Sequence, residues 1–339
     1  MSATQQEIAK LAKVSQSTVS RVIAGDDRVE PALRDRVLAA MERHNYFADS
    51  RGRSLRSRKS GLIGLVLKRQ ADALLDDPFV STLVSAITEY LRGTSYHFCM
   101  DIAHDAEEQS KIYEELLRTR RVDGLIVVEP EANDYRLAQL QRDSFPFVVI
   151  GNPGRVRASS VDNDNVLAGR MATLHLLDAG FHNVGFLAGP DGVHVSDDRL
   201  VGYSFAMRER DGIEMVWHSE FGLKAAEKVA LEIFSNPVRP RALVVLDDFM
   251  ALGVAMAAIR MGMKIPQDLA LVSFNDSSFC QAIEGGLSSV NLNFQAIILQ
   301  ACNLLFNIID NPEADVVRQI IPCELSMRGS SVNPQGGVL

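Results

Sequence analysis

The stretch Gln5–Ala24, QQEIAKLAKVSQSTVSRVIA, decides the fold of the N-terminal part of the chain. Its apolar residues form two groups, each with the i, i+3, i+4 spacing of one helix face: Ile8, Leu11 and Ala12, then Val19, Val22 and Ile23. Ser15 lies in the short break between the groups and is placed to cap the second helix. The pattern predicts two short helices joined by a tight turn. This is either a helix-turn-helix, whose second helix fits the major groove of DNA, or an ordinary surface hairpin.

The second predicted helix carries polar side chains on its surface. Gln16, Ser17, Ser20 and Arg21 can donate to, or accept from, base edges and phosphates. Arg28, in the turn-rich loop that follows, is a further candidate for a phosphate contact.

A third helix is predicted over Pro31–His44, because proline suits a first helical turn and an apolar stripe follows it: Leu33, Val37, Leu38 and Met41. We expect this stripe to close a three-helix head around four apolar residues of the first two helices: Ile8, Leu11, Val19 and Val22. Tyr46 is expected to pack on the same small core.

Asp49–Ser60, DSRGRSLRSRKS, contains five cations, one acid and a single large apolar residue, Leu55. One interpretation is a solvated flexible linker. The other is a segment that orders on DNA, where cations such as Arg51 neutralise phosphates and Leu55 wedges into the minor groove. The composition alone leaves both open.

The charge is divided unevenly along the chain. The 339 residues carry a net charge of −8, yet residues 1–60 hold 12 Lys and Arg against 7 Asp and Glu, while the remainder holds 23 against 36. A basic head on an acidic body is typical of a small DNA-binding domain attached to a larger domain. No apolar run approaches the roughly 20 residues that span a bilayer, and no secretory signal precedes the head, so we expect a cytoplasmic protein without membrane segments. The four cysteines lack metal-ligand spacing, and neither a metal nor a cofactor is expected.

From Gly61 onward, predicted strands and helices alternate. The strands are 62–67, 96–100, 124–128, 147–150, 184–187, 242–246 and 270–274; the helices are 79–91, 107–117, 135–140, 167–177, 199–208, 225–234, 250–261 and 296–309. This alternation predicts an α/β body with parallel sheets covered by helices on both faces, divided into two lobes because single cores rarely grow so large. The last helix and the segment 316–321 let the chain cross back between the lobes. A ligand is expected in the cleft, at the carboxyl ends of the strands.

Motifs along almost the whole chain resemble the LacI/GalR family of bacterial transcriptional repressors. In the head they are Val14-Ser15-x-Ser17-Thr18-Val19-Ser20-Arg21-Val22 and Asn45-Tyr46, followed by Leu55 and Gly61-Leu62-Ile63-Gly64. In the body they include Val122-Asp123-Gly124, Asp164-Asn165-x-x-x-Gly169, Arg199-x-x-Gly202-Tyr203, Asp248-x-x-Ala251-x-Gly253 and Leu287-Ser288-Ser289-Val290. The resemblance implies a three-helix head (1–47), a hinge (48–60), a two-lobed periplasmic-binding-protein-like body (61–330) and a tail (331–339). The N-lobe would comprise 61–162 and 292–322, and the C-lobe 163–290 and 323–330.

The resemblance also implies roles on DNA. Gln16 and Ser17 match the variable base-reading pair, and Arg21 matches an arginine that contacts bases and phosphates. Ser15, Thr18 and Ser20 match backbone contacts, and Leu55 matches the leucine that two subunits insert together into the minor groove. A symmetric homodimer implies a pseudo-palindromic double-stranded operator. The tail lacks a heptad repeat, which favours a dimer over a tetramer.

The chain departs from the family pattern at the hinge. Ala48 and Asp49 replace a usual Pro-Asn, and Gly52 replaces an alanine. Glycine in a helix costs roughly 0.5–1 kcal/mol relative to alanine, so this hinge helix is expected to form less readily.

The predicted effector site combines polar side chains with aromatic platforms, as sugar hydroxyls and sugar rings require. Its members are Phe79, Arg199, Phe221, Asp247, Asn275 and Phe294. Asp247 and Asn275 replace the family's usual residues at two strand ends, and both have an alternative role as helix caps. Phe79 and Phe221 have an alternative role in core packing. Arg199 is expected at the start of a helix, where its charge opposes the helix dipole unless a ligand compensates it.

These observations favour an allosteric regulator in which a small ligand, a sugar, changes the lobe angle and thereby the operator affinity. A phosphorylated, nucleobase or protein effector remains an alternative. An enzyme is disfavoured because no nucleophile elbow or phosphate-binding loop is present, and His194, Ser196 and Asp197 are mere sequence neighbours. A transport-type solute-binding protein is disfavoured by the basic head.

Overall fold

The computed structural model describes residues 3–23, 26–44, 46, 59–69 and 78–332. The chain forms two compact units, Met1–Gly61 and Leu62–Leu339, which we call the head and the body and describe separately. Among the described residues, no helix has the length and apolar character needed to cross a membrane.

The head contains three described helices, α1 (Gln5–Leu11), α2 (Gln16–Ile23) and α3 (Pro31–Arg43). Thr4 and Glu7 form a reciprocal capping box at the start of α1, which satisfies two backbone donors that a helix end leaves open. The helices enclose a small core, and Tyr46 packs against it as predicted. The helix-turn-helix prediction is confirmed.

The predicted head core is wrong at Leu11 and Leu38, which are about half exposed, at 50% and 48%. The positions facing inward are instead filled by small side chains: Ala9, Ala12 and Ala40. Three short helices that approach closely leave space for alanine rather than leucine at these positions. The apolar spacing could not show which of two neighbouring positions on a helix face is buried.

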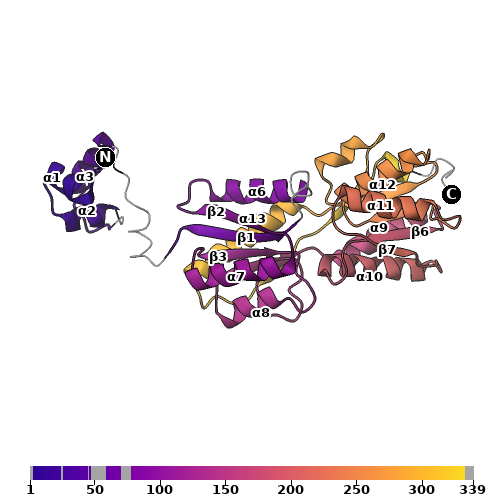
Figure 1. Cartoon of the computed structure of the whole chain (residues 1–339), viewed down its shortest axis with the longest axis horizontal. Coiled ribbons are helices and arrows are strands. Elements are labelled where there is room, and N and C mark those ends of the chain that lie inside the picture. Colours follow the sequence, from indigo (N-terminus) through magenta and orange to yellow (C-terminus); the bar gives the residue numbers. More distant parts are fainter. Residues whose placement is uncertain (1–2, 24–25, 45, 47–58, 70–77, 333–339) are drawn as a thin grey trace. The chain divides into compact units, whose positions relative to one another are not determined.

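The first lobe of the body is a six-stranded sheet in the order β11-β5-β4-β3-β1-β2. Its strands are β1 (Leu62–Lys68), β2 (His97–Ala103), β3 (Gly124–Val128), β4 (Phe147–Ile150), β5 (Ser160–Asp162) and β11 (Arg318–Ile320), and all described pairings are parallel. Helices α6 (Pro78–Leu91) and α13 (Phe294–Asp310) cover one face, and α7 (Ala106–Thr119) and α8 (Tyr135–Arg142) cover the other (Figure 1). Strands β1, β3 and β4 are buried on both faces. Their sequences are therefore continuous apolar runs instead of an alternation of apolar and polar residues.

The second lobe is another six-stranded sheet, in the order β12-β10-β9-β8-β6-β7. Its strands are β6 (Val184–Ala188), β7 (Val216–His218), β8 (Ala242–Val245), β9 (Ala270–Phe274), β10 (Ser288–Asn291) and β12 (Glu324–Ser326), the last antiparallel to β10. Helices α9 (Asn165–Asp178) and α10 (His194–Glu209) lie on one face and α11 (Leu223–Phe234) and α12 (Asp248–Arg260) on the other (Figure 1).

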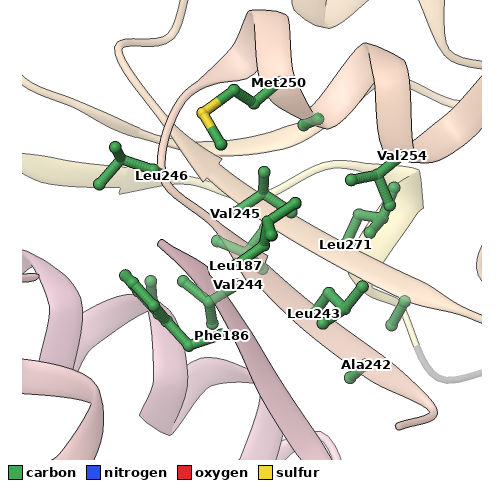
Figure 2. Packing of buried hydrophobic residues seen from close by; sticks show 14 of the residues in the cluster. Phe186, Leu187, Ala242, Leu243, Val244, Val245, Leu246, Met250, Val254 and Leu271 are labelled. Carbon is green, nitrogen blue, oxygen red and sulfur yellow. The ribbon is translucent and has the colours of Figure 1, made fainter. Parts of the chain in front are cut away.

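Side chains from both faces of this second sheet are buried. Figure 2 shows Leu243 and Val245 of β8 and Val254 of α12 among the buried residues of this cluster. The rings of Phe186 of β6 and Tyr203 of α10 pack with their centroids 5.4 Å apart. The predicted α/β fold, with a helix-turn-helix head and two parallel-sheet lobes, is therefore confirmed.

Five short strands were missing from the prediction: β5, β7, β10, β11 and β12. Four of them, β5, β10, β11 and β12, adjoin the places where the chain passes between the two sheets. They are only three or four residues long, too short to carry a period of their own.

Candidate effector pocket and DNA-reading helix

Helix α2 is held at its start by Ser15, as predicted. The Ser15 Oγ accepts a hydrogen bond of 3.1 Å from the backbone N–H of Thr18 and shares hydrogen bonds with the hydroxyls of Ser17 and Thr18. Val19 and Val22 anchor the inner face of α2 in the core. The side chains that remain exposed on its outer face are Gln16, Ser17 and Arg21, whereas Thr18 and Ser20 are half-buried.

Arg28 lies on the exposed loop after α2, but its guanidinium is already engaged. It donates two hydrogen bonds of 2.9 Å to the carboxylate of Asp26, and this pairing holds the pKa of Asp26 at about 2. A phosphate that approaches Arg28 therefore competes with Asp26. Arg51 and Leu55 lie outside the described residues.

The six predicted effector residues all line one cavity of the body, between the two sheets. They are Phe79, Arg199, Phe221, Asp247, Asn275 and Phe294. The non-protein space there is about 900 Å³, part of it open to solvent. Most of these residues follow the carboxyl ends of strands, where parallel sheets place ligand sites.

Arg199 occupies a different place from the one expected. Helix α10 begins at His194, so Arg199 lies in its second turn and the argument from the helix dipole is wrong. The polar residues that made His194–Asp198 look like a loop are partly internal: Ser196 is buried and its Oγ accepts from the backbone N–H of Gly189.

Arg199 is nevertheless a central group of the cavity. It is only 4% exposed, its Nε donates to Asn165 Oδ1 at 3.0 Å, and its Nη1 donates to the Leu246 carbonyl at 2.7 Å. Its guanidinium lies over the Phe274 ring at 4.4 Å. Burial lowers the pKa of Arg199 to about 10, against the opposing effect of nearby carboxylates, so the side chain stays cationic at neutral pH.

Asp247 and Asn275 line the cavity, and each also has a structural feature of its own. Asp247 Oδ1 accepts a hydrogen bond of 2.7 Å from the backbone N–H of Met250 and so caps α12. This is the alternative role, as a helix cap, that the sequence indicated for Asp247. Asn275 has a left-handed φ of 101°, unusual for a residue other than glycine. Strained backbone of this kind gathers at functional sites.

The aromatic members come from both lobes. Phe79 of α6 and Phe294 of α13 form a tilted ring pair with centroids 4.9 Å apart. Phe221, from the second lobe, lies under the guanidinium of Arg69 at 5.0 Å. The aromatic surfaces required to stack on a sugar ring are therefore present in the cavity.

Several polar cavity residues were not predicted: Arg69, Glu129, Asn152, Asp162, Asn163 and Asn165. Arg69 is buried and pairs in a bidentate manner with Glu129. Arg69 and Glu129 directly follow β1 and β3, and Asp162 ends β5. The rule that sites gather at the carboxyl ends of parallel strands would have indicated them.

The chain combines a helix-turn-helix head with a two-lobed body that has a cavity between its sheets, and the comparisons find the same two parts. Residues 4–49 match the family model "Bacterial regulatory proteins, lacI family", and residues 173–331 match "Periplasmic binding protein-like domain". The chain therefore carries a helix-turn-helix domain of the lacI family and a periplasmic-binding-protein-like domain, and its relatives are LacI-family regulators.

Similar proteins include the HTH-type transcriptional regulator CelR of Thermobifida fusca, 27% identical over 334 residues, which cover 96% of this chain and 98% of CelR. A solved transcriptional regulator CelR–cellobiose complex has a TM-score of 0.74 at 26% identity and covers 97% of this chain and 99% of that one. The lac repressor dimer bound to operator and an anti-inducer has a TM-score of 0.85 at 21% identity, over 98% and 100% of the two chains, and shows the same fold.

Proposed function

We propose that this protein is a sequence-specific transcriptional regulator, a repressor, whose operator affinity is set by a small ligand bound between the lobes. The observation that carries the proposal is the presence in one chain of an outward-facing polar helix, α2, and a polar–aromatic cavity. Gln16, Ser17 and Arg21 read bases and phosphates, with Ser15, Thr18, Ser20, Arg28 and Arg51 as supporting contacts and Leu55 as the minor-groove wedge. A regulator of this kind works on the bacterial chromosome, in the cytoplasm.

The proposed effector is an uncharged sugar. Aromatic rings and paired donors and acceptors suit a sugar ring with hydroxyls, and the relative CelR has been solved with cellobiose. The cavity contains three carboxylates (Glu129, Asp162 and Asp247) against two guanidinium groups, and Arg69 is already paired with Glu129. An anionic effector such as a sugar phosphate is therefore less well supported than a neutral one.

The proposed mechanism is a ligand-dependent change in lobe angle. Besides the crossing strands, backbone hydrogen bonds link the lobes across the cleft: Ala132 N–H to the Gly192 carbonyl at 2.8 Å, and His194 N–H to the Pro130 carbonyl at 3.1 Å. The Asn152 amide adds a bond of 3.2 Å to Asp198. A ligand that favours one lobe angle shifts the operator affinity, and linkage requires the operator to shift the ligand affinity by the same factor.

A homodimer on a pseudo-palindromic operator is part of the proposal. The outer side of α12 and its C-terminal cap expose three large apolar side chains, Met256, Ile259 and Met261, and Ile259 is 71% exposed. Exposed apolar groups gathered on one helix support an interface between subunits.

The DNA-binding half of the proposal is tested by selecting binding sites from a random double-stranded library with the full-length protein. We expect enrichment of a sequence with two inverted half-sites, and sedimentation of the complex at two subunits per site. Binding that decreases steeply with salt but enriches no sequence would contradict a specific regulator.

The ligand-binding half is tested by thermal shift with cellobiose, other neutral sugars, sugar phosphates and nucleobases. Specific binding to the native state raises the melting temperature. A shift with a neutral sugar that also changes operator affinity supports the proposal. A shift confined to sugar phosphates or nucleobases would replace the neutral sugar by that class.

A further inference from the structure

Asp162 is the last residue of β5, where the chain leaves the first sheet for the second lobe, and its side chain lines the cavity. Its two carboxylate oxygens have different surroundings. Oδ1 accepts from the backbone N–H of Asn163 at 2.8 Å and from the side-chain amide of Asn165 at 2.9 Å. Within the part of the chain that the structure describes, no group donates to Oδ2.

Arg199 faces the same cavity with the opposite charge. Its Nε and Nη1 have acceptors, but among the described residues no acceptor contacts Nη2 and no carboxylate lies within 4 Å of the guanidinium. Asn165 stands between the two charges, because its amide nitrogen donates to Asp162 while its amide oxygen accepts from Arg199. The two charged groups are thus oriented by one amide without forming an ion pair.

Two other buried arginines of the body, Arg136 and Arg69, pair directly with a carboxylate. Arg136 donates directly to Asp134, at 2.5 Å, with both side chains less than 5% exposed, and Arg69 pairs directly with Glu129. Direct pairing is how a fold limits the free energy cost of burying charge. Buried Arg199 and half-buried Asp162 bear this cost without direct pairing, and groups that cost stability are retained where binding requires them.

We propose that Asp162 is an effector-binding carboxylate, which together with Arg199 holds neighbouring hydroxyls of the ligand. One hydroxyl donates to Asp162 Oδ2, and the adjacent hydroxyl accepts from Arg199 Nη2. This inference rests on the proposed function and deepens it, since it assigns the first-lobe partner of Arg199. It also selects neutral polyhydroxyl ligands, because a phosphate or carboxylate at this position would be repelled by Asp162.

The surroundings of Asp162 make the role testable by pH. Burial raises the pKa of Asp162 to about 6; Arg199 opposes this rise and Asp198 adds to it, while Asp247 faces the same cavity. Because the folded-state pKa lies above the unfolded value, the stabilising contribution is present at low pH and is lost as pH rises through about 6. A ligand that needs the ionised carboxylate, in contrast, binds more tightly as pH rises over the same range.

The first experiment needs no ligand. Asp162→Asn keeps an oxygen for Asn163 and Asn165 but removes the half-buried charge, so the melting temperature of the unliganded full-length protein at pH 7.5 should rise by about 2–4 °C. The matched control is Asp134→Asn, which leaves Arg136 without its partner and should lower the melting temperature. If Asp162→Asn melts lower than the wild type or fails to fold, Asp162 is a structural residue and the proposal is overturned.

The second experiment measures binding of cellobiose, and of any neutral sugar that shifts the wild type, at pH 5.0 and 7.5. The wild type should bind more tightly at pH 7.5, and Asp162→Asn should lose tenfold or more in affinity together with this pH dependence. Unchanged affinity in Asp162→Asn would overturn the proposal. If no sugar binds while Asp162→Asn still stabilises the unliganded protein, the hydroxyl-binding role of Asp162 is overturned, and operator selection with the full-length protein decides the regulator proposal separately.

Discussion

The side-chain amide of Asn163 donates a hydrogen bond of 2.7 Å to the carbonyl oxygen of Ile321, and so joins two of the strands that cross between the lobes. The same amide donates at 3.0 Å to the carbonyl of Leu292, on the third crossing segment. Asn163 is 4% exposed, so water cannot easily replace these bonds. One buried amide therefore holds the three crossings together, directly beside the cavity residue Asp162.

We expect Asn163→Ala to lower the free energy of unfolding by about 1–3 kcal/mol, because one buried and one half-buried carbonyl lose their donor. Urea unfolding of the full-length protein measures this change, and separate transitions for the two lobes would show that the crossings have been uncoupled. Asn152→Ala is the control, since it removes one half-buried bond across the cleft and one local bond from the backbone N–H of Gly154, and it should cost less than Asn163→Ala. Equal effects of the two substitutions would contradict a special role for Asn163.

Arg199→Ala should abolish the response of operator binding to the effector, because the cavity loses its one described cation that is not paired with a carboxylate. Operator binding without ligand should change by less than about threefold, because the proposed DNA-reading residues all lie in the head or the hinge. Fluorescence anisotropy with labelled operator, with and without the sugar, measures both. Arg170→Ala, which breaks a half-exposed ion pair with Glu209 on the neighbouring surface, is the control and should retain the response. Loss of unliganded operator binding in Arg199→Ala would refute this division of roles.

Gly202→Ala should destabilise the second lobe by at least about 2 kcal/mol. A Cβ at this position would lie 2.1 Å from the carbonyl oxygen of Val166, because α9 and α10 touch backbone to backbone here. Val201→Ala, on the exposed side of the same helix, should stay within about 0.5 kcal/mol and serves as the control. Thermal unfolding compares the two, and a mild effect of Gly202→Ala would mean that the helices can separate at little cost.

Gln16→Ala should change the preferred bases at one or two positions of each half-site, at a cost of about 1–3 kcal/mol for the wild-type operator, while non-specific binding stays the same. Binding to a panel of single-base operator variants measures this change in preference. Glu42→Ala, on the exposed surface of α3, is the control and should leave the preference unchanged. A uniform loss of affinity for every DNA sequence would assign Gln16 to a backbone contact.

The sequence alone determined the elements and the fold class. The apolar spacing of Gln5–Ala24 and the alternating runs of the body report local periodicity, and each predicted helix and strand depends mainly on its own residues. The sequence also predicted that Asp247 and Asn275 follow strand ends and lie at one edge of the sheet, because a parallel sheet brings such ends together.

Only the tertiary structure decided which groups meet in the cavity and in what environment. Arg199, Asn165 and Asp162 come from two helices and a strand of three residues, and their hydrogen bonds depend on how α9 and α10 pack, through Gly169 and Gly202, against each other. The exposure of Leu11 and the burial of Ala12 likewise depend on the distance between helices, which no single-helix pattern encodes. Periodicity is a local property of the chain, whereas burial and charge pairing depend on residues distant in sequence, and this difference set the limit of what could be predicted.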